Sequence, residues 1–263
     1  MDPASRATDI SVIRFSSVDS TSLYARRVFE SGQLAGRTLM VLAETQSGAI
    51  GRFKRSWDSP RGGLWCTLAH PIEQGGPGDR VIEGLGLRVG LAATCVIAAL
   101  LAAGEPEASV RMKWPNDVLI DGRKVCGILS EVLNRQTPSG PERCVLVGVG
   151  LNVNLNVRDL RPDLRDRATT IRSHLGHDLD LEHVRMRLTY ALVGALGERG
   201  ISAATLAAAR ERLHGVDQPV TITLPGGGRL SGVFAGLDEH GLALVRSDAG
   251  LVHAPPGSMI MED

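Results

Sequence analysis

The chain carries no excess of charge of either sign, since 29 Lys and Arg balance 29 Asp and Glu. Without a global field that attracts polyanions, binding to nucleic acid or to an anionic membrane is not expected. The aliphatic stretch at 91–103 is shorter than the ~20 residues that a membrane span needs and is predicted to be a buried helix. The amino terminus bears Asp2, Arg6 and Asp9 in place of the apolar centre of a secretory signal, which favours a cytosolic protein.

Cysteine is also rare, and its pattern excludes common uses. The four residues are Cys66, Cys95, Cys126 and Cys144. They are widely spaced in apolar runs and form no CxxC pair, so we predict buried, reduced thiols instead of disulfides or metal ligands. His174, His177 and His183 gather in one polar segment, but no further ligand follows at metal spacing. We therefore predict surface histidines and no protein-ligated metal.

Apolar volume, by contrast, is ample. Apolar residues make up 43% of 263 residues, enough for one large domain and a small one. Strand-like runs and helical patterns alternate up to residue 213, which predicts an α+β core with a mixed sheet. The predicted strands are 12–15, 38–43, 64–69, 110–113, a hairpin over 118–133, and 144–152. The predicted helices are 20–30, 79–103, 181–197 and one that Ser202 caps.

The sequence pattern changes after residue 213. Short strand-like runs at 220–224, 229–235, 241–245 and 250–253 are separated by glycine-rich turns. About fifty residues of this kind predict a small β-barrel. The boundary is expected near residue 214, which gives domains 1–214 and 215–263.

The segment Lys113-Trp114-Pro115-Asn116-Asp117 is the most informative in the chain. The two apolar runs that follow it are separated by Asp121-Gly122, a dipeptide typical of tight β-hairpins. Pro115 lacks a backbone donor and favours extended geometry at Trp114. Lys113 is therefore expected at the end of a strand, facing a pocket, where an ammonium group can act chemically.

This segment, with Gly122-Arg123-Lys124-Val125-Cys126-Gly127-Ile128-Leu129 after it, resembles the biotin protein ligases. Further similar segments follow the family's order: Asp19-Ser20-Thr21-Ser22, Ala43-Glu44-Thr45-Gln46, Gly51-Arg52, Gly62-Gly63-Leu64-Trp65, Gly148–Asn154 and Thr169-Thr170-Ile171. The resemblance covers roughly residues 15 to 261. It implies an enzyme that makes biotinyl-5′-AMP from biotin and MgATP and passes biotin to one lysine of a biotin carboxyl carrier protein. It also implies an SH3-like carboxyl-terminal domain and, because few residues precede the first strand, a stand-alone ligase without a DNA-binding domain.

The resemblance also implies roles for individual residues. Lys113 and Arg52 would be catalytic, because an acyl adenylate joins two anions and requires cations at the reacting phosphate. The implied biotin-binding residues are Ser20, Thr21, Ser22, Gln46, Ile50, Gly51, Arg52, Lys113 and Gly127. The implied nucleotide-binding residues are Arg52, Arg55, Trp57, Asn116, Lys124 and Asn152. Trp57 could stack on the nucleotide or pack behind the loop, and Asn116 and Asp117 could help to position Mg²⁺ or simply form a turn.

The chain departs from the family in its ligand-covering loop. The usual Gly-Arg-Gly-Arg is replaced by Ala49-Ile50-Gly51-Arg52, while Arg55 matches. A missing glycine and a missing arginine should affect retention of the adenylate more than its formation, although Lys54 could restore part of the charge. Ser22 stands where the family usually has Asn, so one hydroxyl replaces an amide.

Two other interpretations are open. A lipoate or octanoate transferase of the same superfamily is one, against which the Lys113 segment and the barrel-like carboxyl terminus count. A biotin sensor that has lost efficient transfer is the other, motivated by Ala49, Ile50 and Ser22. Gly148-Val149-Gly150 lacks the third glycine and the following helix of a dinucleotide fingerprint. The oligomeric state is left open, a homodimer included. No proposed ligand contact lies beyond residue 214, so the barrel is expected to serve transfer more than ligand binding.

Overall fold

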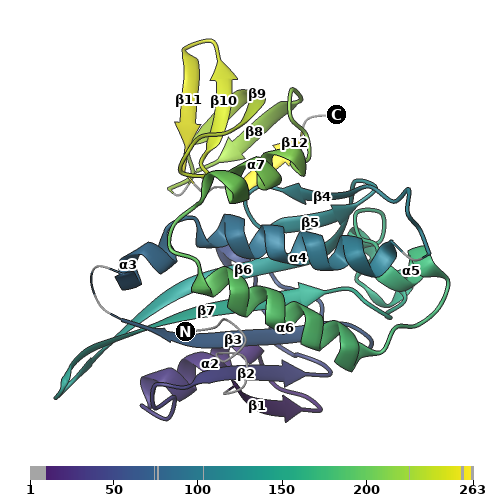
Figure 1. The fold of residues 1–263 in the computed structure, drawn as a ribbon. Helices are drawn as coiled ribbons and strands as arrows, with labels where there is room; N and C mark the ends of the chain where they lie inside the picture. Colours follow the sequence, from purple (N-terminus) through teal and green to yellow (C-terminus); the bar gives the residue numbers. More distant parts are fainter. Residues whose placement is uncertain are drawn as a thin grey trace.

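A seven-stranded mixed sheet forms the centre of the protein (Figure 1). The structure is a computed structural model that describes residues 10–73, 75, 77–102, 104–224, 226–255 and 258–261. The strand order is β1-β2-β3-β7-β6-β5-β4, with β1 parallel to β2 and the other described neighbours antiparallel. The strands are β1 (Ile10–Phe15), β2 (Thr38–Ala43), β3 (Leu64–Ile72), β4 (Val110–Lys113), β5 (Asp117–Ile120), β6 (Arg123–Thr137) and β7 (Gly140–Leu151). The predicted α+β class and mixed sheet are confirmed.

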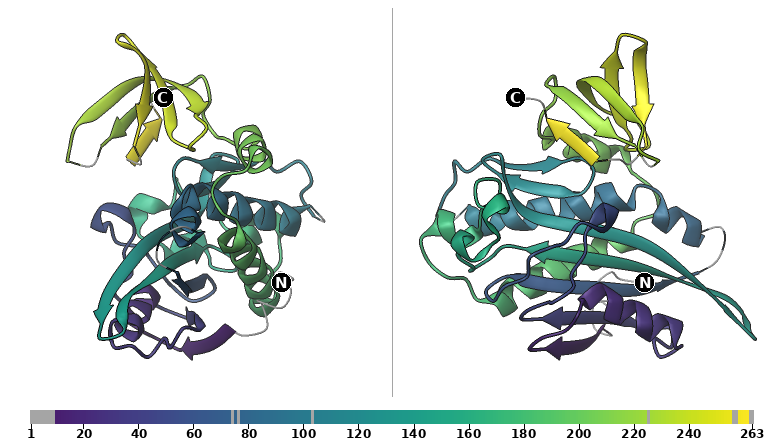
Figure 2. Two further views of the ribbon diagram at one scale, coloured as in Figure 1. Left: turned by 60° about the vertical axis from the view of Figure 1, so that its left-hand side comes forward. Right: turned by 180° about the vertical axis from the view of Figure 1, so that it is seen from behind.

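Helices cover both faces of the sheet. α4 (Leu85–Leu101) and α6 (Leu181–Gly197) lie on one face, and α2 (Thr21–Glu30) lies on the other (Figures 1 and 2). Side chains alternate along a strand, so each strand supplies both faces. Cys66, Val147 and Val149 belong to the large apolar cluster with α4 and α6, whereas Ala69 and Leu146 pack with α2. The remaining helices are α3 (Pro77–Ile82), α5 (Ile171–Leu175), α7 (Ala203–Glu211) and the short turns η1 (Arg52–Lys54), η2 (Val157–Asp159) and η3 (Pro162–Leu164).

Helix starts follow the predicted caps, but one predicted helix is broken. The side chains of Ser20 and Ser202 accept hydrogen bonds from backbone N–H groups in the first turns of α2 and α7. The helix predicted over 79–103 is two helices, because Gly84 between α3 and α4 has φ 61° and a Cβ there would lie 2.1 Å from Ile201. Residue 103 lies outside the described residues.

The carboxyl-terminal strands form a second, antiparallel sheet in the order β11-β10-β9-β8-β12 (Figure 2). They are β8 (Pro219–Thr223), β9 (Arg229–Leu237), β10 (Ala243–Ser247), β11 (Gly250–Ala254) and β12 (Ser258–Met261). β12 was not predicted. Apolar side chains from all five strands share one cluster, in which Phe234, Ile222 and Val245 are fully buried. The strands therefore wrap around a common core, as a small barrel-like domain requires.

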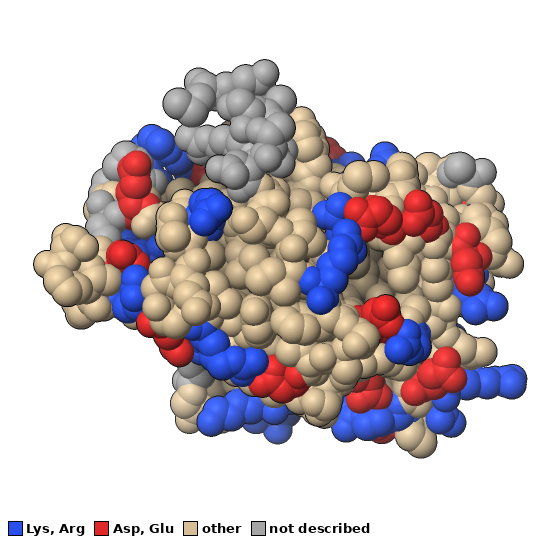
Figure 3. All heavy atoms as spheres, turned by 90° about the horizontal axis from the view of Figure 1, so that it is seen from below, with Lys and Arg blue, Asp and Glu red and all other residues tan. Residues whose placement is uncertain are grey.

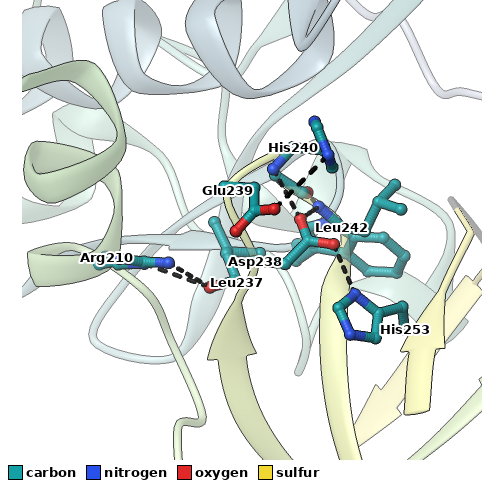
Figure 4. A network of polar contacts seen from close by, with 9 residues as sticks. Arg210, Leu237, Asp238, Glu239, His240, Leu242 and His253 are labelled. Carbon is teal, nitrogen blue, oxygen red and sulfur yellow. Dashed lines mark hydrogen bonds and ion pairs between the residues drawn. The ribbon is translucent and has the colours of Figure 1, made fainter. Parts of the chain in front are cut away.

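The same apolar cluster joins this sheet to the large domain, because it includes Leu87, Met112 and Trp114. The Trp114 indole N–H donates to the carbonyl of Gly241, at 3.1 Å, in the turn between β9 and β10. On the other side of the turn, the Arg210 guanidinium of α7 donates to the carbonyl of Leu237 at 2.7 Å (Figure 4). The residue after Lys113 is thus held by the small domain.

The surface charge and the cysteines largely follow the expectations from the composition. On the face shown in Figure 3, basic side chains lie among acidic ones and neither sign dominates. Searching the described residues for a helix long and apolar enough to cross a membrane finds none. Cys66, Cys126 and Cys144 are buried free thiols, as predicted, but the prediction was wrong for Cys95, which lies exposed on α4. A mostly aliphatic helix still presents one side to solvent, and Cys95 lies on that side.

Candidate active site

One row of residues crosses the sheet on the face that carries α2. Direct cross-strand neighbours project to the same side of a sheet. The row runs through Ala43, Trp65, Gly150, Gly127, Asp117 and Lys113, from β2 to β4. Its two adjacent glycines have no side chains, so they form the floor of a shallow trough. Lys113 lies at one end of this row, at the end of β4, as its sequence context predicts.

The Trp57 indole lies on the glycine floor. A Cβ on Gly150 would lie 2.5 Å from the indole, and one on Gly127 would lie 2.7 Å from it. The Lys124 ammonium lies 5.0 Å from the ring centroid, and Trp65 packs against the ring edge-on at 6.4 Å. The indole Nε1 is buried, and the described residues supply it with no hydrogen-bond acceptor. Biotin was expected to lie against Gly127, but that space is filled by Trp57, so the indole must move for a ligand to lie there.

Lys113 lies in a cluster of charges. It is half-buried, and burial lowers the pKa of its ammonium, while the Asp117 carboxylate opposite raises it. The Asp117 carboxylate forms an ion pair with the Lys124 ammonium at 2.6 Å. The positive charge of Arg167 also lowers the pKa of Lys113. Arg167 lies next to Lys124 in space because Lys124 forms a β-bridge with Ala168, the residue after Arg167. Sequence reasoning missed Arg167, because it lies in an irregular segment without a motif.

The cations of the covering loop divide into two groups. A guanidinium N–H of Arg52 points to the Asn116 side-chain oxygen at 3.4 Å, and burial lowers the pKa of Arg52 against the opposing charge of Asp117. Asn116 in turn donates to the carbonyl of Ile128 at 2.7 Å, which holds its loop on the hairpin. Arg55 is exposed and lies 5.9 Å from the Phe53 ring. Arg52 therefore joins the Lys113 cluster, and Arg55 does not in this conformation.

The covering loop itself is a small hairpin. The backbone N–H of Trp57 donates to Ala49 at 2.9 Å, that of Gly51 donates to Arg55 at 2.8 Å, and Ile50 bridges Ser56. At its tip, Phe53 and Lys54 have φ of 55° and 56°, the left-handed region that disfavours side chains. The Ile50 side chain is 42% exposed. The methyl group of Ala49 is buried, so the fold accommodates alanine where the family usually has glycine. Ile50 exposes an apolar side chain where the family usually has arginine.

A polar cluster lies along the same face, two residues further along the strands. The backbone N–H of Thr21 donates to the Gln46 side-chain oxygen at 2.8 Å, and the Gln46 amide N–H donates to Ser59 at 2.9 Å. The Thr67 hydroxyl lies 2.9 Å from those of both Thr21 and Ser22. A Cβ on the neighbouring Gly148 would lie 2.8 Å from the Ser22 oxygen. The predicted Ser20–Ser22 and Gln46 set thus comes together, with Ser20 as the helix cap.

Thr67 and Ser59 belong to this cluster but were not predicted. Thr67 is fully buried within Leu64–Ile72, a run that reads as an ordinary core strand. A threonine on the trough side of a buried strand is the signal that could have found it, because a buried hydroxyl needs hydrogen-bond partners.

Asn152 lies at the end of β7 and is almost fully buried. Its side-chain N–H donates to the carbonyl of Thr169 at 3.0 Å, and its backbone N–H donates to Val125 at 2.8 Å. Asn152 therefore fixes the segment that carries Arg167 against Lys124. Its predicted contact with adenine stays a prediction.

Larger surface hollows lie away from this row. One of about 470 Å³ lies between the end of α4 and β4, lined by residues such as Ala98 and Arg111, and one of about 590 Å³ lies between α4 and α6. Neither hollow is lined by a predicted site residue. We assign the site to the row because it brings Lys113, Gly127 and the Trp57 indole onto one face of the sheet.

Comparison with known proteins shows the family to which the chain belongs. The family model described as "Biotin/lipoate A/B protein ligase family" matches residues 15–152. The chain belongs to this family. A second model, "Biotin protein ligase C terminal domain", matches residues 216–261. The resemblance stated from the sequence is therefore confirmed, and the small domain falls where the family's carboxyl-terminal domain does.

The chain matches individual members of the family over different extents. The chain is 31% identical over 219 residues to the biotin–[acetyl-CoA-carboxylase] ligase of Paracoccus denitrificans, covering 80% of this chain and 85% of that one. It is 34% identical over 143 residues to the bifunctional ligase/repressor BirA of Bacillus spizizenii and spans only 40% of that protein's length. The structure of the Aquifex aeolicus biotin protein ligase in complex with biotin and ATP matches with a TM-score of 0.72 and 25% identity, covering 96% of this chain and 99% of that chain.

Proposed function

We propose that the protein is an ATP-dependent biotin protein ligase, which forms biotinyl-5′-AMP and transfers biotin to one lysine of a biotin carboxyl carrier protein. The observation that carries the proposal is the cross-strand row, in which Lys113 lies opposite Asp117 and Asp117 lies opposite Gly127 of the glycine floor. Ligands of ligases with the same fold agree with it, since the Aquifex aeolicus enzyme binds biotin and ATP.

Lys113 and Arg52 supply what adenylation needs. The biotin carboxylate must approach an α-phosphate of like charge, and fixed cations lower the cost of that approach and of the charge that develops at phosphorus. Burial lowers the pKa of the Lys113 ammonium, and the Asp117 carboxylate opposes that shift. Both cations are half-buried, so water screens them less than it screens exposed groups.

The polar cluster suits the ureido head of biotin, which donates through two N–H groups and accepts through one oxygen. The oxygens of Ser22 and Thr67 and the side chain of Gln46 offer both kinds of partner on the trough face. In the structure these groups form hydrogen bonds with one another and with Thr21 and Ser59. Binding then exchanges internal hydrogen bonds for ligand hydrogen bonds without leaving a buried group unpaired.

Magnesium fits the residues present as a companion of the nucleotide. Among the described residues no group of three or more His, Cys, Asp and Glu could hold a metal by itself. Mg²⁺ that is bound through phosphates needs only one or two protein carboxylates, and Asp117, with Asn116 beside it, provides one. When bound, the ion would neutralise phosphate charge.

Calorimetry separates this function from that of a lipoate or octanoate transferase. The full chain is titrated with biotin and with lipoate, each with and without MgATP. We expect biotin to bind and MgATP to be turned over to pyrophosphate in its presence. Binding of lipoate in preference to biotin would reject the proposal, and tight binding of biotin without pyrophosphate release would indicate a sensor.

A further inference from the structure

The segment after α7 adds a short parallel neighbour to the end strand of the large sheet. The backbone N–H of Met112 donates to Arg212 at 2.7 Å, and that of His214 donates to Met112 at 2.9 Å. These two bonds pair Met112 with Leu213 in a parallel bridge. The site row therefore does not end at Lys113, because one more stretch of chain lies beside β4.

The register decides where the His214 side chain points. Met112 and Leu213 are both buried in the cluster that joins the two domains, on the α4 side of β4. Side chains alternate along extended chain, so Lys113 and His214, which follow them, face the opposite side. That side is the trough. His214 is consequently the neighbour of Lys113 in the row, across from Asp117.

Charges around His214 favour its neutral form. Burial lowers the pKa of the imidazole, and the cations of Lys113 and Arg111 on β4 lower it further. These two are the charged groups that act on His214 within the described part of the chain, and no hydrogen bond to its ring is found there. A half-buried neutral imidazole beside the reacting centre is a proton acceptor in its active form.

We propose that His214 accepts a proton from the ammonium of the acceptor lysine in the transfer step. The proposal rests on the ligase function given above. The lysine nitrogen, once neutral, forms the amide bond to the acyl carbon of biotinyl-AMP. The bond from that carbon to the phosphate oxygen breaks, and AMP leaves with the electron pair. The second proton of the attacking nitrogen passes to solvent.

The chemistry requires such a group. A free lysine has a pKa of ~10.4, so only about one in 10³ is neutral at pH 7. Lys113 is itself a cation, and the Asp117 carboxylate is engaged by Lys124. Of the titratable groups of the row in the described structure, His214 is the one that lies beside Lys113 as a neutral base.

The test compares two nucleophiles on one adenylate. Biotinyl-AMP is supplied to the full chain, and transfer is measured to a carrier domain and to hydroxylamine, an amine that is already unprotonated at neutral pH. In His214→Gln, transfer to the carrier should fall ~10²-fold relative to transfer to hydroxylamine. His183→Gln, an exposed histidine on α6, is the matched control and should leave that ratio unchanged.

The pH profile provides an independent readout. The rate of transfer by the unmodified protein should level off above the pKa of His214. The rate for His214→Gln should keep rising up to pH ~9, as the ammonium of the acceptor lysine loses its proton to solvent. Equal ratios and parallel profiles for both proteins would overturn the assignment. Failure of the unmodified protein to make biotinyl-AMP from biotin and ATP would instead reject the ligase function.

Discussion

Two glycines set the depth of the trough beside Lys113. Gly127 and Gly150 are direct neighbours on β6 and β7, and the Trp57 indole touches the backbone of both. Neither glycine needs its conformational freedom here, because neither has a positive φ. Their function is to leave space, and the first added carbon would remove it.

We predict that Lys113→Ala lowers adenylation by ~10² to 10³ without unfolding the protein, because it removes a cation at the reacting phosphate and no core group. Biotin-dependent pyrophosphate release and thermal melting are measured on the same sample. Arg246→Ala, an exposed cation on β10, is the control. Pyrophosphate release that matches that of the unmodified protein would remove Lys113 from the mechanism.

We predict that Gly150→Ala displaces the Trp57 indole and weakens biotin binding at least ~10-fold, at a stability cost of ~1–3 kcal/mol from overpacking. Trp fluorescence and calorimetry report the two effects. Gly194→Ala is a matched control on α6, since a Cβ there meets nothing within 4 Å. It should be neutral or stabilise by ~0.5–1 kcal/mol. Unchanged biotin affinity in Gly150→Ala would show that the glycine floor is not the biotin site.

At the scale of elements, the covering hairpin is where this chain departs most from its family. Ala49 is buried and tied to Trp57 by a backbone hydrogen bond, so movement of the loop and of the indole are coupled. Opening the trough to ligand therefore displaces residues 49–57 as a unit. Ile50 offers no charge to hold the loop on an anionic adenylate.

We predict that restoring the usual pair, in Ala49→Gly/Ile50→Arg, reduces escape of biotinyl-AMP after a single turnover several-fold, because an added guanidinium pairs with the phosphate. Released biotinyl-AMP is measured by chromatography. Lys54→Ala in the unmodified background tests compensation, since Lys54 is the exposed cation at the hairpin tip. If the double variant releases as much biotinyl-AMP as the unmodified protein, Ala49 and Ile50 do not weaken retention of the adenylate.

Local signals predicted elements well and long-range contacts poorly. Asp121-Gly122 predicted a tight turn, and both residues have positive φ there. Gly84 was predicted to be part of one helix because the apolar run continues through it, and the Ile201 side chain that lies against it is far along the chain. β12 was missed because its pairing with β8 is likewise distant in sequence.

The site residues likewise divide into those that local sequence predicted and those that only long-range contacts bring in. Residues in contiguous motifs, such as Lys113 and Gln46, were predicted and are found in the row or the polar cluster. Thr67, Arg167 and His214 carry no motif and enter the site only through strand register or through a bridge between distant segments. Arg167 and His214 have no local signal of this kind, and for Thr67 the signal is a hydroxyl within a buried strand.

At the scale of the molecule, the small domain supports the catalytic loop. Asp238, at the start of the β9–β10 turn, accepts from the backbone N–H groups of His240 and Leu242 at 2.8 Å, and its other oxygen lies 2.7 Å from the His253 ring (Figure 4). That turn carries Gly241, the acceptor for Trp114. The turn therefore supports Trp114, the residue that follows Lys113. That the barrel serves transfer more than ligand binding stays a prediction.

We predict that Asp238→Ala destabilises the protein by ~1–3 kcal/mol, because the backbone N–H groups of His240 and Leu242 lose a charged acceptor. Burial alone would raise the pKa of Asp238, but the hydrogen bonds from His253, Leu242 and His240 outweigh it and lower the pKa. The difference in the free energy of unfolding between the unmodified protein and Asp238→Ala should therefore be fully present at pH 7. It should disappear as the pH falls below ~4 and through the lowered pKa of Asp238 in the folded protein. Urea unfolding at several pH values measures it, with the exposed neighbour Glu239→Ala as control. A difference that persists unchanged in acid would assign the effect to packing.

The mass of a carrier domain tests the central claim most directly. The full chain is incubated with biotin, MgATP and the carrier domain of a biotin-dependent carboxylase, and the carrier is weighed by mass spectrometry. We expect a gain of one biotinyl group on one lysine, dependent on ATP, and its loss in Lys113→Ala. A carrier of unchanged mass, with folded protein and every substrate present, would contradict the account.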